Sequence, residues 1–172
     1  TGTMISQLTV NQSGHLFAVS YGAGIFRSTD NGTSWLQVNQ GLPQVNFEGY
    51  RTMCIAPNGD IYSSADNLGM YKSTNNGNTW IQTGLTTGIY NKIAVHSNGY
   101  IFIGTQTGGG LYRSTNGGNS WIHLENGLPS SWVVNSITIT PNGNIYACTS
   151  GSTSMYYSTN YGDSWQPSNL PG

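Results

Sequence analysis

Side chains suited to acid–base or nucleophilic chemistry are scarce in this sequence. Of its 172 residues, six are Asp or Glu, five are Lys or Arg, and three are His. A glycosidase of the two-carboxylate kind needs two acids that converge across a cleft. Asp30, Asp60 and Asp163 fall in turns that we expect at one side of the fold, which leaves Glu48 and Asp66 as the candidate pair. We predict that this pair is not catalytic.

The remaining chemical candidates do not form a motif. His15, His96 and His123 are scattered without metal-ligand spacing, and their order indicates no Ser–His–acid triad. Only 6% of residues are charged and the net charge is −1, so no basic stripe is present to bind nucleic acid. No apolar run reaches the length of a membrane helix. We therefore predict no catalytic residues, no metal, no cofactor, no nucleic acid and no membrane insertion.

One eight-residue segment occurs four times. STDNGTSW (28–35) returns as STNNGNTW (73–80), STNGGNSW (114–121) and STNYGDSW (158–165), and we call these segments the octets. They begin 45, 41 and 44 residues apart, a period typical of propeller blades built from several short strands. The residues common to them are Ser28, Asp30, Gly32, Trp35, Ser73, Asn75, Gly77, Trp80, Ser114, Asn116, Gly118, Trp121, Ser158, Asn160, Gly162 and Trp165.

Each period reads as four strands. In the first repeat these are ISQLTV, LFAVS, GIFRST and a strand that starts at Trp35, and the same pattern returns in the other three. We predict an all-β protein, a single β-propeller domain over 1–172. Its four blades are four-stranded antiparallel sheets at about 1–43, 44–86, 87–129 and 130–172. They form either a closed four-blade ring or part of a larger assembly.

The octet is placed at the turn from the third to the fourth strand of each blade. Its third residue, Asp or Asn, has a side-chain oxygen that can accept backbone N–H bonds across the turn. Its Gly gives the backbone freedom that such a turn needs, and its Trp enters the fourth strand as a large apolar anchor. We predict that these are structural residues, one anchor for each blade.

The pattern Ser-x-Asp-x-Gly-x-(Ser/Thr)-Trp resembles the Asp-box, or bacterial neuraminidase repeat (BNR), in all four copies. The resemblance covers essentially the whole chain and implies a β-propeller of the sialidase and sortilin-like superfamily. It implies no particular reaction, because such propellers include sialidases, xyloglucan hydrolases, sortilin-type receptors and photosystem assembly factors. A sialidase would need three convergent arginines, whereas Arg27 and Arg113 occupy the same outward position of two different repeats.

Four aromatic residues lie outside the repeated columns. Phe47, Tyr50, Tyr90 and Trp132 are in the connections between repeats, which vary in length and chemistry while the octets stay constant. Variable loops on a constant scaffold are a natural place for specificity. These residues either bind a carbohydrate or a protein, or cover the inner ends of the blades.

Partners and location follow from the repeats and the low charge. Because all four strands of a blade come from one repeat, the first and last blades keep uncovered faces unless the ring closes on itself. We expect copies of the chain, or neighbouring repeats of a longer parent chain, to cover them. Asn11 and Asn31 begin N-glycosylation sequons, NQS and NGT, and glycans are further candidate partners.

These observations predict a non-catalytic, extracellular or cell-surface propeller module. It would be a structural or adhesive building block that assembles into a surface structure or fibre. The alternatives are a carbohydrate- or protein-binding propeller and, third, a fragment of an Asp-box glycoside hydrolase.

Overall fold

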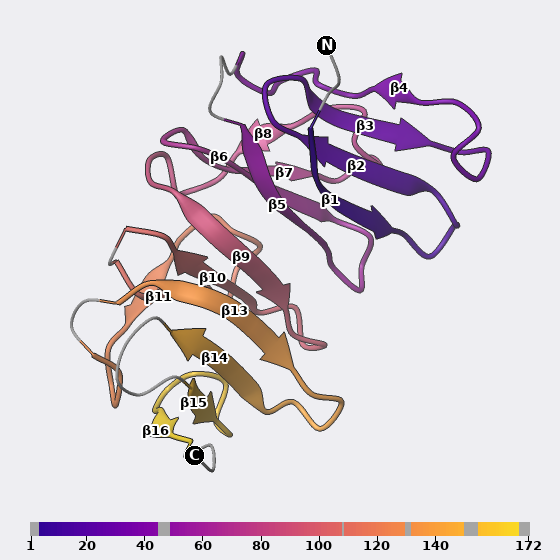
Figure 1. Ribbon diagram of the computed structural model, residues 1–172. Coiled ribbons are helices and arrows are strands. Elements are labelled where there is room, and N and C mark those ends of the chain that lie inside the picture. The colour runs from indigo at the N-terminus through magenta and orange to yellow at the C-terminus, as the bar shows by residue number, and fades with distance from the viewer. Residues whose placement is uncertain (1–3, 45–48, 108, 130–131, 150–154, 169–172) are drawn as a thin grey trace. The chain divides into compact units, whose positions relative to one another are not determined.

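The computed structural model describes residues 4–44, 49–107, 109–129, 132–149 and 155–168 (Figure 1). These residues form sixteen strands. Within them, no helix has the length and apolar character needed to cross a membrane. The strands of the first two repeats are Ile5–Val10 (β1), Leu16–Ser20 (β2), Gly24–Ser28 (β3), Leu36–Gln37 (β4), Tyr50–Ile55 (β5), Ile61–Ala65 (β6), Gly69–Ser73 (β7) and Ile81–Gln82 (β8).

The last two repeats follow the same plan. Their strands are Tyr90–Val95 (β9), Ile101–Thr105 (β10), Leu111–Ser114 (β11), Ile122–Leu124 (β12), Val134–Ile139 (β13), Ile145–Thr149 (β14), Met155–Ser158 (β15) and Gln166–Pro167 (β16). They pair into four sheets in sequence order, β1-β2-β3-β4 through β13-β14-β15-β16, and all neighbouring strands are antiparallel. Each predicted blade range thus contains one complete four-stranded sheet, which confirms the predicted architecture.

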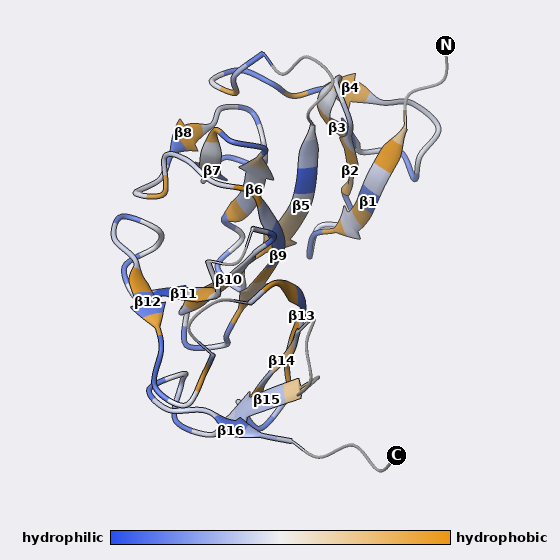
Figure 2. Cartoon of the chain, turned by 60° about the vertical axis from the view of Figure 1, so that its left-hand side comes forward, coloured by the Kyte–Doolittle hydropathy of each residue, from blue (hydrophilic) through white to orange (hydrophobic). Residues whose placement is uncertain are grey.

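The chain divides into two compact units, Thr1–Ile89 and Tyr90–Gly172. The first unit holds the first blade (β1–β4) and the second (β5–β8), and the second unit holds the third (β9–β12) and the fourth (β13–β16). Most of the hydrophobic colour in Figure 2 lies on strands, while the loops between them are mostly hydrophilic. Each unit is described by itself below.

The two faces of a blade have different roles. Because neighbouring residues of a strand point to opposite faces, Ala18 lies on one face of the first blade with its register partners Leu8 and Phe26, and we call this the leading face. The opposite face, with Val19 and its register partner Ile25, is the trailing face. The corresponding faces of the other blades follow from the same register.

Each unit has one hydrophobic core, formed where the trailing face of one blade packs on the leading face of the next. In the first unit this core comprises Phe17, Val19, Ile25, Val38, Leu42, Tyr50, Met53, Ile61, Ala65, Tyr71 and Trp80. In the second unit it comprises Phe102, Leu111, Leu124, Trp132, Val134, Ile145, Ala147, Tyr156 and Trp165. Both units therefore bury the same pair of faces.

Within each unit, polar side chains form hydrogen bonds between the first strands of the two blades. The Gln7 amide on β1 donates to the Met53 carbonyl and accepts the Met53 N–H on β5, both at 2.8 Å. In the second unit, the Asn91 amide on β9 donates to the Val134 carbonyl of β13 at 3.4 Å. These bonds satisfy backbone groups that the two separate sheets cannot satisfy for each other.

Candidate functional site

Each octet forms a tight turn between the third and fourth strands of its blade. In the first octet, the Ser28 hydroxyl donates to Asp30 Oδ1 at 2.8 Å and accepts the Gly32 N–H at 2.9 Å. Asp30 Oδ1 also accepts the Ser34 N–H at 2.9 Å. Asn31 and Gly32 have φ angles of 58° and 87°, a left-handed backbone that Gly adopts easily and Asn tolerates. The side chains of the motif therefore hold the turn closed.

Asparagine keeps this turn in the other three octets. The side-chain oxygens of Asn75, Asn116 and Asn160 accept the N–H of the residue four positions later at 2.9 to 3.0 Å. Their amide groups donate to the hydroxyl of that same residue. Asp30 differs in its charge, and the hydrogen bonds from Ser34 and Ser28 lower its pKa to about 2. A charge is therefore not needed for the turn, as expected for a structural motif.

The tryptophan that closes an octet also joins its blade to the preceding one. The Trp80 backbone N–H donates to the Gln40 carbonyl at 2.9 Å, and its indole N–H donates to the Val38 carbonyl at 2.8 Å. The ring is buried, with 3% of the residue exposed. In the second unit, the Trp165 N–H donates in the same way to the Asn126 carbonyl at 2.9 Å. The octet thus closes a turn and bonds to the neighbouring blade.

A glycine lies where the two backbones of each joint come closest. Gly41 has a φ of +90°, and a Cβ at this position would lie 2.1 Å from the Trp80 carbonyl oxygen. Gly127 has a φ of +85°, and its Cβ would lie 2.0 Å from the Trp165 carbonyl oxygen. Any side chain here would force the two blades apart.

Arg27 and Arg113 belong to these joints. The Arg27 guanidinium donates to the Asn76 carbonyl at 2.6 Å and to the Asn78 side chain at 2.8 Å, both in the octet of the second blade. Arg113 makes the same bridge to the fourth octet, at 2.6 and 2.7 Å. We had assigned both arginines only an outward direction. The residue before the octet is Arg, Lys, Arg and Tyr in successive repeats. Arg in the first and third repeats alone was the signal in the sequence for these two bridges.

The aromatic residues proposed for binding are buried. Tyr50, Tyr90 and Trp132 are 1% to 5% exposed, and Trp132 packs in the core of the second unit with its ring 5.9 Å from that of Tyr156. Burial raises the pKa of Tyr90 to about 12 and also raises that of Tyr50. Their rings are not open for stacking, so their positions favour our second interpretation, that they cover the inner ends of the blades. Phe47 lies outside the described residues.

Of the candidate acid pair, the structure describes Asp66 alone. Glu48 lies outside the described residues. Asp66 is buried, and both of its carboxylate oxygens are 2.6 Å from Arg51 Nε. A hydrogen bond between a guanidinium and a carboxylate is a strong, charge-assisted contact. The geometry of Asp66 is that of a structural ion pair.

The other described acids also have structural partners. Asp60 contacts Lys72 at 2.7 Å, Asp163 contacts Arg113 at 2.7 Å, and Glu125 contacts His123 at 2.9 Å. Among the residues that the structure describes, no three His, Cys, Asp or Glu side chains are grouped so that they could hold a metal ion. Each of these acids therefore contacts a basic side chain of the fold.

The two sequons differ in their surroundings. The Asn11 side-chain oxygen accepts the backbone N–H groups of Ser13 and His15, and its amide nitrogen donates to Asn76 Oδ1 at 2.8 Å. A glycan on this nitrogen would break the contact with the second octet. Asn31 is exposed in the first octet turn. The structure therefore leaves the sequon at Asn31 as the more accessible one.

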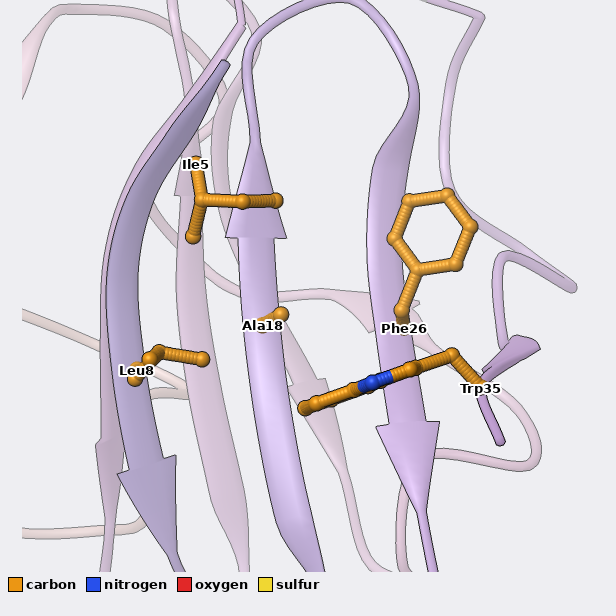
Figure 3. A pocket seen from close by; sticks show the side chains of 5 residues that line it. All are labelled: Ile5, Leu8, Ala18, Phe26 and Trp35. Carbon is orange, nitrogen blue, oxygen red and sulfur yellow. The ribbon is translucent and has the colours of Figure 1, made fainter. Parts of the chain in front are cut away.

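An open apolar surface lies on the leading face of the first blade, one of the two blades for which the sequence predicted an uncovered face, although its residues were not named there. Its side chains line a shallow depression of about 420 Å³ (Figure 3). They are Ile5, Leu8, Ala18, Phe26 and Trp35. Leu8 is 64% exposed and Trp35 is 40% exposed, although Trp35 is the octet tryptophan of its blade.

Known proteins resemble the chain in structure. Neither a protein-family model nor a curated protein sequence matches it. The GH74 xyloglucanase from Xanthomonas campestris matches 93% of this chain with 29% of its own, at 19% identity and a TM-score of 0.77. YCF48 from Cyanidioschyzon merolae matches 100% with 58% of its own, at 17% identity and a TM-score of 0.70.

A sensor protein is similar as well. The extracellular domain of the one component system BT4673 from B. thetaiotaomicron matches 99% of this chain with 22% of its own, at 20% identity and a TM-score of 0.76. At these identities the likeness shows the fold alone. The chain is an all-β protein whose four sheets match propeller blades, and it spans between about a fifth and three fifths of these propeller chains.

Proposed function

We propose that this chain is a non-catalytic propeller module of the Asp-box type that works outside the cell as a structural or adhesive building block and assembles with copies of itself. The observation that carries the proposal is the double role of the octet. In both units the tryptophan of the second octet bonds to the preceding blade, and an arginine of that blade bonds back to the octet. The repeated motif is used for stacking blades.

The positions of the acids support a non-catalytic role. General acid–base chemistry needs a carboxylate aimed at a substrate, with a pKa suited to proton transfer. The Asp66 carboxylate accepts a hydrogen bond from Arg51, and the Asp30 carboxylate accepts hydrogen bonds from Ser34 of its own turn. The structural contacts of these two acids support the proposal of a non-catalytic role.

The burial of three of the four aromatic residues does not support the binding alternative, which called for rings open to a ligand; Tyr50, Tyr90 and Trp132 are buried, and Phe47 lies outside the described residues. No other described feature favours a carbohydrate site strongly enough to carry a second function.

Several features fit an assembling protein outside the cell. The chain has very few charges, and a surface poor in charge is weakly protected against association. The leading face of the first blade is apolar and open. The sequon at Asn31 is exposed, and one of the similar structures is an extracellular domain.

The native mass of the purified chain tests the proposal. Light scattering over a range of concentrations should give masses that rise from 18.4 kDa, the mass of one chain, to at least twice that value. A chain that stays at 18.4 kDa throughout would argue against a building block. Hydrolysis of xyloglucan or of sialylated oligosaccharides by the chain, lost in Asp66→Asn, would show that it is an enzyme.

A further inference from the structure

The leading face of the first blade is the most exposed apolar surface of the first unit. Of the ten large hydrophobic side chains that are exposed among the described residues, four lie in or next to β1: Met4, Ile5, Leu8 and Val10. A soluble protein rarely leaves such a contiguous patch uncovered unless the patch binds something. The face therefore needs an occupant.

The fold contains covered copies of this same face. In the second blade, the positions equivalent to Ile5, Leu8, Ala18, Phe26 and Trp35 are all buried; they are Tyr50, Met53, Ser63, Tyr71 and Trp80. In the fourth blade, all five are buried or half-buried; they are Val134, Ile137, Ala147, Tyr156 and Trp165. The first blade alone presents the face openly among these three.

The covering surface in both units is the trailing face of another blade. A Cβ on Gly77 of the second octet would lie 3.2 Å from the Phe17 ring and 3.4 Å from Val38, so the second octet packs directly on the first blade. In the second unit, a Cβ on Gly162 would lie 3.0 Å from the Phe102 ring and 3.1 Å from Leu124. The protein thus shows twice which surface fits a leading face.

A complementary trailing face is partly open on the fourth blade. The residues at the positions of Phe17, Val19 and Ile25 are Tyr146, Cys148 and Met155, and all three are half-buried. Neither they nor the five residues of the leading face carry a charge, so these side chains can meet without desolvating a charged group. The proposed joint shares the apolar contact of the joints inside each unit but not their arginine bridge, because the fourth blade has Tyr157 at the position of Arg27 and Arg113.

We propose that the leading face of the first blade binds the trailing face of the fourth blade of a second copy of this chain. This inference rests on the proposed function and specifies its surface and its partner. A second copy is favoured because each copy of this chain carries a trailing face at the same register positions as the faces that cover a leading face inside both units. Two different faces meet, so the contact is heterologous and gives a closed ring or an open fibre.

Leu8→Glu tests the surface, because Leu8 is 64% exposed and belongs to no core, so the variant should fold. A carboxylate there would be buried without a partner in the joint, which should weaken association about 100-fold or more. Ile81→Glu is the matched control, since Ile81 is also 64% exposed but lies on the second blade, outside the leading face. We expect the Leu8 variant to remain at 18.4 kDa and the Ile81 variant to associate like the natural chain.

Met155→Glu tests the partner surface by complementation. Alone, this variant should also stay monomeric. An equimolar mixture with Leu8→Glu restores one intact joint, because each variant keeps the face that the other has lost, and it should form a species of twice 18.4 kDa. The Met155→Glu chain keeps an intact leading face, which includes Trp35. In this chain, hydroxyl-radical labelling of Trp35 should be several-fold lower in the mixture than in the variant by itself.

The outcomes separate this inference from the proposed function. If the natural chain associates and Leu8→Glu does so equally, the docking surface is wrong and the building-block function stands. If the Leu8→Glu variant by itself does not associate, and its mixture with Met155→Glu also stays monomeric, the fourth blade is not the partner surface. If the natural chain is monomeric at every concentration, both proposals are overturned, and strong protection of Trp35 in that monomer would mean that the chain covers this face itself.

Discussion

The close approach at Gly41 provides a stringent test of how the blades are joined. We consider the substitution Gly41→Ala together with Gly59→Ala as its control. The two glycines have nearly the same backbone, with φ angles of +90° and +87°. They differ in space: a Cβ on Gly41 would lie 2.1 Å from the Trp80 carbonyl oxygen, whereas a Cβ on Gly59 has no heavy atom within 4 Å. The pair separates the cost of the clash from that of the left-handed backbone.

The magnitudes follow from these two contributions. Placing Ala in the left-handed region costs roughly 1 to 2 kcal/mol, part of which is returned because Ala restricts the unfolded chain. Gly59→Ala should therefore lower the free energy of unfolding by about 1 kcal/mol. Gly41→Ala has the same cost plus that of moving one backbone away from another, about 1 to 3 kcal/mol for an overpacked interior. We expect a total loss of about 2 to 4 kcal/mol, a large fraction of the 5 to 15 kcal/mol typical of domains.

Urea unfolding followed by far-ultraviolet circular dichroism measures both values, at concentrations low enough to keep the chain monomeric. Comparable losses for the two variants would refute the reasoning, because they would mean that the two backbones are not in contact at this joint. A large loss for Gly59→Ala would refute it as well, since nothing surrounds that position.

Three further predictions concern the octets. Trp80→Ala should cost about 4 kcal/mol of unfolding free energy and Trp35→Ala about 1 kcal/mol in the monomer, because Trp80 is buried and Trp35 is open; equal losses in urea would contradict this. Asp30 has its pKa lowered to about 2 from 3.8, so its stabilising effect is complete above about pH 4 and is lost as the pH falls towards 2. Asp30→Asn should remove that part of the acid dependence, and an NMR titration that places the Asp30 pKa near 4 would argue against the hydrogen bonds in the turn. Arg27→Met keeps the aliphatic stem but loses both bonds to the second octet, and should lower the stability of the first unit by about 1 kcal/mol; an unchanged urea midpoint would show that this bridge contributes nothing.

Much of the architecture could be predicted because the repeat is local. A sheet of four short antiparallel strands is made by neighbouring segments of one repeat, and the octet turn is held by side chains within seven residues of one another. Periodicity, alternation and turn chemistry act over the same short range, so they indicated the strands and turns correctly. The sequence also predicted that Asn could replace Asp in three octets without loss of the turn, since both side chains present the same acceptor oxygen.

The joints between blades and the candidate surface could not be predicted in this way. Whether an aromatic residue is a core residue or a ligand platform depends on which face of which blade covers it, and Trp132 and Trp35 illustrate the two outcomes. Trp132 stands outside the repeated pattern and is buried, whereas Trp35 belongs to the pattern and is open. Arg27 reaches an octet 49 positions away, a contact that depends on how two sheets pack.

The amino-acid sequence was therefore sufficient for the number of blades, the order of their strands and the closure of their turns, because hydrogen bonds and hydrophobic alternation within one repeat specify them. Only the packing of one blade on another decided which equivalent residues became core and which remained exposed. Burial is a property of a pair of surfaces, and four nearly identical octets acquire different environments according to whether another blade lies against them.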